Sequence, residues 1–257
     1  MKTIKVGGVN FYNGDIISLV NNVIDLISIN PHQNYCISAT GAHGVVETRK
    51  QLSFKKVLNS FYLNMPDGMP IVWVGRIKGA KEIRRCYGPD FFKSLIFKTS
   101  SLPINHFFCG GNEGVAEELK VVCNQQYNNQ NIVGTFCPPF REMTELELKE
   151  LAQQINQTKA NIVWIGLSSP KQEVFASKLR EYVNCDFLIT VGAAFDFHTG
   201  KVKQAPRWVQ KIGMEWFFRL SMEPKRLYKR YFEIVPVFIW LNIKEFVDFY
   251  IFKKKSV

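Results

Sequence analysis

The sequence predicts an α/β protein: a Rossmann-like, mostly parallel sheet flanked by helices, followed by a basic, aromatic helical appendage. Short apolar runs that read as strands alternate with segments whose apolar residues recur at helical spacing. The connections are short, and this alternation favours right-handed βαβ units around a parallel sheet. From about residue 205 the chain becomes aromatic and basic. We therefore expect a core of residues 1–200 and an appendage of residues 201–257.

The first part of the chain carries a hairpin, a strand and two helical segments. Residues 2–14 predict a hairpin that turns at a Gly-Gly pair. Asp15 is the expected N-cap of the next helix, whose buried stripe would comprise Ile16, Leu19, Val20, Val23 and Ile27. A strand is expected at residues 35–40 and a helix within residues 45–62. A loop should follow at residues 64–70, restrained by two prolines and a glycine.

The second part is more regular. Strands are expected at residues 104–109, 131–136, 161–167 and 187–195, and helices at residues 115–127 and 174–183. Between them, Thr144 and Glu147 form the capping box of another helix. In the appendage, Pro224 should begin a helix.

The composition of the chain indicates which kinds of molecule it could bind. With 257 residues and 46% hydrophobic content, the chain is long enough to bury a large core. Its net charge is +11, and residues 201–257 hold thirteen Lys and Arg against five Asp and Glu, so most of the excess lies there. A surplus localised in this way indicates a basic surface for phosphate, nucleic acid or anionic lipid. Arg226 and Arg230 would share a basic helix face beside an apolar one, as in interfacial helices.

The compartment and the relation to a membrane can also be predicted. The six cysteines form no CxxC pair, so we expect free thiols in a reducing cytosol. The N-terminus lacks a secretory apolar region. The apolar stretch from Val235 to Leu241 is interrupted by Pro236 and is too short to span a bilayer, which needs about 20 residues. The protein is expected to lie on a membrane without crossing it.

Three loops after expected strands carry candidate ligand-binding residues. The GGNEG sequence begins at Gly110 and Gly111 and opens a helix that could receive a phosphate, although a structural turn explains its glycines as well. In GLSSPKQE, Lys171 and Gln172 could contact a diphosphate or a sugar, or simply begin a helix. Asp196 could bind a ribose or sugar hydroxyl, or cap the next element.

Asp67 is a candidate general base, and His43 could be either catalytic or a ligand. Asp67 lies in PDGMP, where two prolines restrain the loop, and a carboxylate held in this way suits a general base. An Asp before Gly is also a common turn former. His43 has no other histidine nearby in the sequence, and no D-x-D sequence occurs anywhere. We therefore expect neither a bound divalent metal nor another cofactor.

These motifs occur together and in a fixed order: PDGMPIVW, GPDFF, FFCGGNEGVAE, NIVWIGLSSPKQE, VGAAFDFHTGKVKQAPRWVQKIGMEWFFRL and EPKRLYKRY. In this order they resemble the WecG/TagA/CpsF glycosyltransferases, glycosyltransferase family 26. The resemblance extends from roughly residue 10 to 232, nearly the whole chain.

The resemblance implies an inverting transfer from a UDP-sugar to an undecaprenyl-diphosphate-linked saccharide in cell-wall or surface polysaccharide synthesis. The sugar would be N-acetylmannosamine or similar, or alternatively another hexose or a uronic acid for exopolysaccharide or capsule. The resemblance also implies that residues 201–257 dock on an anionic membrane surface, which would place the protein in the cytoplasm at the inner face of the cell membrane. Packing of the appendage against a second subunit, as a homo-oligomer, is an alternative.

The resemblance also assigns site residues. The catalytic residues that it implies are Asp67, which matches the proposed general base, and Thr40, which matches a position near the acceptor or donor sugar; many members have Asn where this chain has Gly41-Ala42-His43. The nucleotide-sugar pocket would comprise Gly110, Gly111, Lys171, Gln172, Glu173, Gly192 and Asp196. The acceptor or the leaving diphosphate would be held by Arg207, Arg219, Arg226 and Arg230.

Two other classes of function were weighed. A nucleic-acid-binding protein would account for the charge, but no nucleic-acid-binding module is visible. A non-catalytic, membrane-associated protein of the same fold would be expected to lose Asp67 or the PKQE loop, and the sequence retains both. A glycosyltransferase is therefore the favoured interpretation.

Overall fold

One sheet of eight strands forms the centre of the molecule, in the order β1-β2-β4-β3-β8-β7-β5-β6. The structure, a computed structural model, describes residues 1–250, except for the side chains of Arg226 and of residues 248–250. The strands are β1 (Thr3–Val6), β2 (Val9–Tyr12), β3 (Tyr35–Thr40), β4 (Leu63–Pro66), β5 (His106–Gly110), β6 (Ile132–Phe136), β7 (Ile162–Gly166) and β8 (Phe187–Thr190). Strands β1 and β2 are antiparallel, and the other pairings are parallel. The predicted α/β class and mostly parallel sheet are confirmed.

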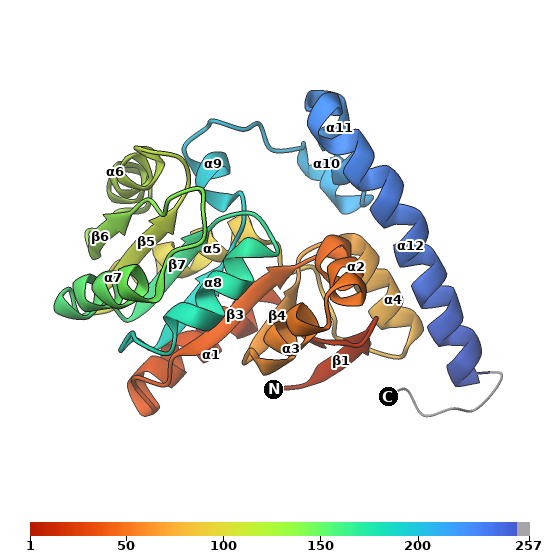
Figure 1. Cartoon of the computed structure of the whole chain (residues 1–257), viewed down its shortest axis with the longest axis horizontal. Coiled ribbons are helices and arrows are strands. Elements are labelled where there is room, and N and C mark those ends of the chain that lie inside the picture. The colour runs from red at the N-terminus through yellow and green to blue at the C-terminus, as the bar shows by residue number, and fades with distance from the viewer. Residues whose placement is uncertain (251–257) are drawn as a thin grey trace.

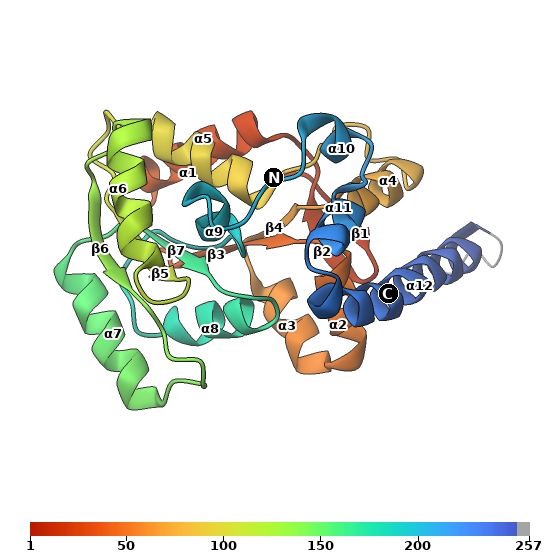
Figure 2. The ribbon, with the colours of Figure 1, turned by 90° about the horizontal axis from the view of Figure 1, so that it is seen from above.

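Figure 1 and Figure 2 show helices on both faces of the sheet. One face is covered by α1 (Ile16–Ile29), α5 (Gly88–Lys98), α6 (Val115–Tyr127) and α9 (Ala194–His198), the other by α3 (Leu52–Ser60), α7 (Glu145–Gln157) and α8 (Lys171–Leu179). Neighbouring residues of β5 serve the two faces, because strand side chains alternate. Phe108 packs in the first cluster with Phe92 and Trp164, whereas Phe107 packs in the second.

Local signals placed most elements correctly. The hairpin turns at Gly7 and Gly8, both with positive φ. Asp15 caps α1 by accepting from the Ser18 amide at 2.8 Å. The capping box of Thr144 and Glu147 is present at α7. These caps work because each supplies an acceptor to amides that the first helical turn leaves unpaired.

Three expected elements differ from the structure. The strand expected at residues 187–195 ends at Thr190, and the chain turns at Gly192 (φ +59°) into the short helix α9. The helical segment within residues 45–62 is divided at Gln51 into α2 (Ala42–Lys50) and α3. The loop expected at residues 64–70 is wrong: β4 includes Pro66, and α4 (Met69–Ile77) begins two residues after Asp67.

The appendage contains α10 (Arg207–Lys211), α11 (Glu215–Met222) and α12 (Pro224–Tyr250). Pro224 begins α12 as predicted, and the helix continues through Pro236. Its residues Ile234, Phe238 and Leu241 pack in a third apolar cluster with residues of α2 and α3. Figure 1 shows α12 running along the side of the core next to α2 and α4. Within residues 1–250, no helix is long and apolar enough to span a bilayer.

His106 lies in the core and gives the fold a defined pH dependence. Trp164 Nε1 donates to His106 Nδ1 at 3.1 Å, and His106 Nε2 lies 2.8 Å from Thr99 Oγ1. Burial lowers the pKa of His106 to about 3, below the ordinary value of about 6.5 expected in the unfolded chain. Protons therefore bind the unfolded state preferentially between these values, and stability is lost as the pH falls below about 6.5.

We expect His106→Gln to reduce this pH dependence, because Gln can accept from Trp164 and donate to Thr99 without titrating. The free energy of unfolding of the wild type should fall more steeply between pH 6 and pH 4 than that of the variant. The difference in slope should approach about 1.4 kcal/mol per pH unit. Urea unfolding at a series of pH values measures both slopes, and parallel slopes would contradict the assignment.

Candidate active site

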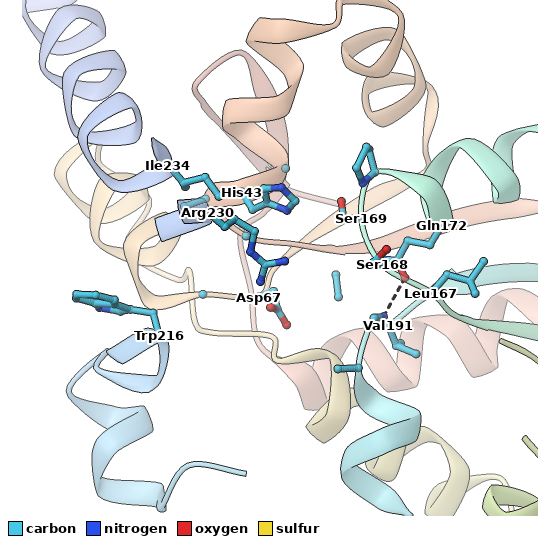
Figure 3. Close-up of a pocket in the computed structure, with 18 of the residues that line it drawn as sticks. His43, Asp67, Leu167, Ser168, Ser169, Gln172, Val191, Trp216, Arg230 and Ile234 are labelled. Atoms are coloured by element: carbon cyan, nitrogen blue, oxygen red, sulfur yellow. Dashed lines mark hydrogen bonds between the residues drawn. The ribbon is translucent and has the colours of Figure 1, made fainter. Parts of the chain in front are cut away.

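The carboxyl ends of the parallel strands meet at one edge of the sheet, where α/β proteins bind their ligands. The segments that follow β3, β4, β5, β7 and β8 all contribute to a cavity of about 1670 Å³. Residues of α4, α11 and α12 close its other side. Figure 3 shows Asp67 between these two sets of walls, with Ser168, Gln172 and Val191 on one side and Trp216, Arg230 and Ile234 on the other.

Asp67 is held by its backbone on both sides. Its N–H donates to the Thr40 carbonyl at 3.2 Å, and its own carbonyl accepts from Arg85 Nε at 2.7 Å. The carboxylate accepts one hydrogen bond, at Oδ1 from the Gly88 N–H at 2.8 Å. Among the described residues no donor binds Oδ2. One carboxylate oxygen is thus fixed, and the other remains available at the cavity wall.

Burial raises the pKa of Asp67 above its ordinary value, although Arg85 and the Gly88 N–H favour the ionised form, and Glu215 raises the pKa further. A pKa displaced upward in this way brings a carboxylate closer to the working range of a general base. The orientation of the Asp67 carboxylate and its raised pKa are therefore both compatible with a general base.

A chain of buried hydrogen bonds joins three strand ends. Thr40 Oγ1 lies 2.8 Å from Ser38 Oγ, which donates to Glu173 Oε1 at 3.1 Å. Gln172 Nε2 donates to the same Glu173 oxygen at 2.9 Å, and Gln172 Oε1 accepts from the Gly192 N–H at 2.9 Å. Burial raises the pKa of Glu173. The chain fixes the loops after β3, β7 and β8 relative to one another.

This arrangement separates the predicted pocket residues into two groups. Gln172, Gly192, Lys171, Asp196 and Gly111 line the cavity. The buried residues Thr40, Glu173 and Gly110 lie behind its wall.

Gly110 shapes the wall through its backbone. It has φ +138°, and a Cβ there would lie 2.6 Å from the Gly166 carbonyl oxygen. A larger residue is therefore excluded by the neighbouring strand.

The predicted cationic residues are separated in the same way. Arg219 and Arg230 line the cavity, and each has a buried Nε with no hydrogen-bond partner among the described residues. A buried guanidinium nitrogen without a partner is costly, so an anionic ligand would satisfy both. Arg207 is exposed and does not line the cavity. The side chain of Arg226 lies outside the described part of the chain.

Asp67 is connected to the appendage through residues that the sequence did not indicate. Arg85, which binds the Asp67 carbonyl, also pairs with Glu215 and donates to Gln210 Oε1 at 3.2 Å. Tyr87 donates to Glu215 at 2.7 Å and stacks under the Arg85 guanidinium, 4.0 Å from the ring centroid. Glu215 and Gln210 lie in α11 and α10. Single-sequence reasoning lacked a signal for these contacts, because about 130 residues separate the partners.

We expect Glu215→Ala to destabilise the protein, because it leaves Arg85 without its carboxylate in a site where both side chains are about 15% exposed or less. Breaking a buried pair at one partner costs about 3 kcal/mol or more. The control is Glu181→Ala, whose pairing with Arg180 is largely exposed and should contribute little. Urea unfolding compares the two variants, and equal stability would contradict a role for Glu215 in holding the appendage.

The chain is similar in sequence to known proteins over nearly its whole length. Residues 4–250 match the model of the glycosyl transferase WecG/TagA/CpsF family. The chain is 26% identical over 245 residues to a Bacillus subtilis (strain 168) protein named N-acetylglucosaminyldiphosphoundecaprenol N-acetyl-beta-D-mannosaminyltransferase, covering 95% of this chain and 93% of the relative. The chain belongs to the WecG/TagA/CpsF family of glycosyltransferases.

Proposed function

We propose that this enzyme moves an N-acetylmannosamine-like sugar from a UDP-sugar to a saccharide linked to undecaprenyl diphosphate, with inversion at the anomeric carbon. The activity for which the Bacillus subtilis relative is named supports this acceptor and this sugar. The observation that carries the proposal is a cavity lined by Asp67 and by Arg219 and Arg230, each of which has a buried Nε without a hydrogen-bond partner among the described residues. Both the donor and the acceptor contain a diphosphate, and guanidinium groups bind phosphates strongly.

Asp67 is the proposed general base. Its Oδ2 takes the proton from an acceptor hydroxyl while that oxygen bonds to the anomeric carbon. On the opposite side, the bond from the anomeric carbon to the diphosphate oxygen breaks, and the nucleoside diphosphate leaves. Arg219 and Arg230 offset the charge that develops on the leaving group or hold the acceptor diphosphate. In-line attack of this kind inverts the anomeric centre.

The donor is proposed to lie over the sheet edge. The N-terminal turn of α8 with Lys171 and Gln172, the Gly192 loop and Gly111 line this part of the cavity. Amides at a helix N-terminus and small residues at strand ends favour phosphate groups. Asp196 lines the same region and is proposed to bind a donor hydroxyl. Another UDP-hexose or a UDP-uronic acid would use the same contacts, in exopolysaccharide or capsule assembly.

The appendage is proposed to bring this site to an anionic membrane surface, at the inner face of the cell membrane. Supporting this, Phe232 and Trp240 of α12 are 77% and 59% exposed, near Lys229 and Lys244. Apolar rings beside cations are typical of helices that lie in a bilayer interface, where each basic residue contributes about 1 kcal/mol. A homo-oligomer would cover the same rings without lipid.

UDP release tests the proposed function. A panel of UDP-sugars is supplied with and without a short-chain polyprenyl-diphosphate N-acetylglucosamine acceptor, in EDTA. We expect release from one donor only when the acceptor is present. Release from no donor, with any acceptor lipid, would refute the proposal, and calorimetry with UDP would then report whether the protein still binds a nucleotide.

A further inference from the structure

The cavity continues beyond Asp67 as an apolar groove between α4 and α12, here called the α4–α12 groove. From α4 it is lined by Trp73, Val74 and Ile77, and from α12 by Phe238, Ile243 and Phe246. Its rims are open to solvent, since Ile77 and Ile243 are 62% and 58% exposed. Exposed apolar residues that lie together around a groove are typical of a binding site.

The α12 side of the cavity has a polar end and an apolar end. Arg230, Ile234, Phe238, Asn242 and Phe246 all line the cavity, and each lies about one turn after the previous one along the helix. Together they span about 24 Å of the helix, at 1.5 Å per residue. Arg230 reaches toward Asp67 at one end (Figure 3). Asn242 interrupts the apolar stretch: its Nδ2 donates to the Phe238 carbonyl at 2.6 Å, whereas its Oδ1 is buried without a hydrogen-bond partner among the described residues.

The two walls of the groove are held together by charged contacts at the far end. Lys78, which follows α4, pairs with Glu245 of α12 at 2.6 Å, and both side chains are about 15% exposed. The Gly7 N–H also donates to Glu245 at 3.0 Å. Because these bonds fix α12 against the hairpin and α4, the groove is a built feature of the fold rather than a gap between mobile parts.

The geometry points to the α4–α12 groove as the binding site for the first isoprene units of the acceptor lipid, with the lipid diphosphate at Arg230. This inference rests on the proposed function. Its occupant must have an anionic head beside a long hydrocarbon chain, because the groove opens into the same cavity as Arg230 and Asp67. A bilayer surface or a second subunit would cover the outer rings of α12 but would not require a groove that leads to the general base.

The groove has a measurable consequence for chain length. Each isoprene unit that enters removes apolar surface from water, so affinity should rise with the number of units. Calorimetry in the absence of detergent and vesicles would compare dimethylallyl, geranyl and farnesyl diphosphates, which carry one, two and three units. We expect affinity for the wild type to rise at least about tenfold from one unit to three.

Substitutions in both walls of the groove, together with a matched control, test whether the groove causes the rise in affinity with chain length. Ile243→Glu in α12 and Ile77→Glu in α4 should abolish the rise with chain length, so that each variant binds the three diphosphates with affinities within about twofold of one another. The control is Phe232→Glu, because Phe232 is also exposed apolar surface on α12 (77%) but does not line the cavity; it should retain the rise. The two wall variants lie on different helices, so misfolding of one leaves the other informative.

The possible results distinguish a failure of the groove assignment from a failure of the proposed function. Two results would refute the assignment of the groove as a lipid-binding site: equal affinity of the wild type for the three diphosphates, or a loss of the chain-length effect in Phe232→Glu as large as in Ile243→Glu. The apolar residues would then belong to a membrane-binding surface or a subunit interface. Transfer to glycan acceptors that is independent of chain length would refute the groove assignment as well, while the transferase remained. Chain-length-dependent binding without transfer to any acceptor would instead support the groove and refute the proposed function.

Discussion

Replacing Asp67 with Asn should lower kcat by about a thousandfold, within the range for loss of a general base, while the KM for the donor changes little. Asn retains an acceptor for the Gly88 N–H at Oδ1 but cannot take a proton from the acceptor hydroxyl. The backbone contacts with Thr40 and Arg85 do not involve the side chain, so the loop should keep its conformation. Steady-state UDP release with saturating acceptor measures the effect.

The pH profile provides the control for this prediction. In the wild type, kcat/KM should rise with pH through a pKa above the ordinary carboxyl range, because burial raises the pKa of Asp67. In Asp67→Asn this acidic limb should disappear, since the group that titrates has been removed. Near-normal turnover by the variant, or an unchanged acidic limb, would show that another residue is the base.

The parts of the site that the sequence predicted are those carried by local signals. Gln172, Gly192 and Asp67 each follow a strand, and parallel strands bring their carboxyl ends to the same edge. Strand–helix alternation indicated this position for Gln172, whereas the family resemblance indicated Asp67 and Gly192, because the strand before Asp67 was not expected and Gly192 was expected inside a strand. Thr40 was expected at the end of a strand and Glu173 in the turn after another strand. In the structure Thr40 ends β3, Glu173 lies in the first turn of α8, and both side chains belong to a buried chain of hydrogen bonds.

The remaining contacts depend on tertiary packing. The expected loop at residues 64–70 was wrong because its prolines are compatible with ordered elements: Pro66 ends a strand, and Pro70 lies in the first turn of α4. Arg85 and Glu215 meet only after the appendage folds back on the core, and sequence periodicity contains no information about such a pair. The α4–α12 groove likewise arises between segments about 160 residues apart.

Arg230 is expected to contribute most among the residues of the appendage. Its Nε is buried without a partner among the described residues, beside Asp67 and at the head of the groove. Arg230→Ala should therefore reduce kcat/KM about a hundredfold, as expected for loss of a charge-assisted contact to a diphosphate. Arg230→Lys should recover part of the activity, because Lys retains the charge but not the two-pronged geometry.

Lys229→Ala is the matched control, since Lys229 is the preceding residue of α12, is exposed and does not line the cavity. It should reduce kcat/KM less than threefold on a soluble short-chain acceptor, and more on acceptor embedded in anionic vesicles, where each surface cation adds about 1 kcal/mol. If Arg230→Ala affected only the vesicle assay, as Lys229→Ala is expected to, Arg230 would belong to membrane docking alone. A loss of similar size in both assays requires a contact with the substrate itself, because a soluble acceptor offers no bilayer for the appendage to bind.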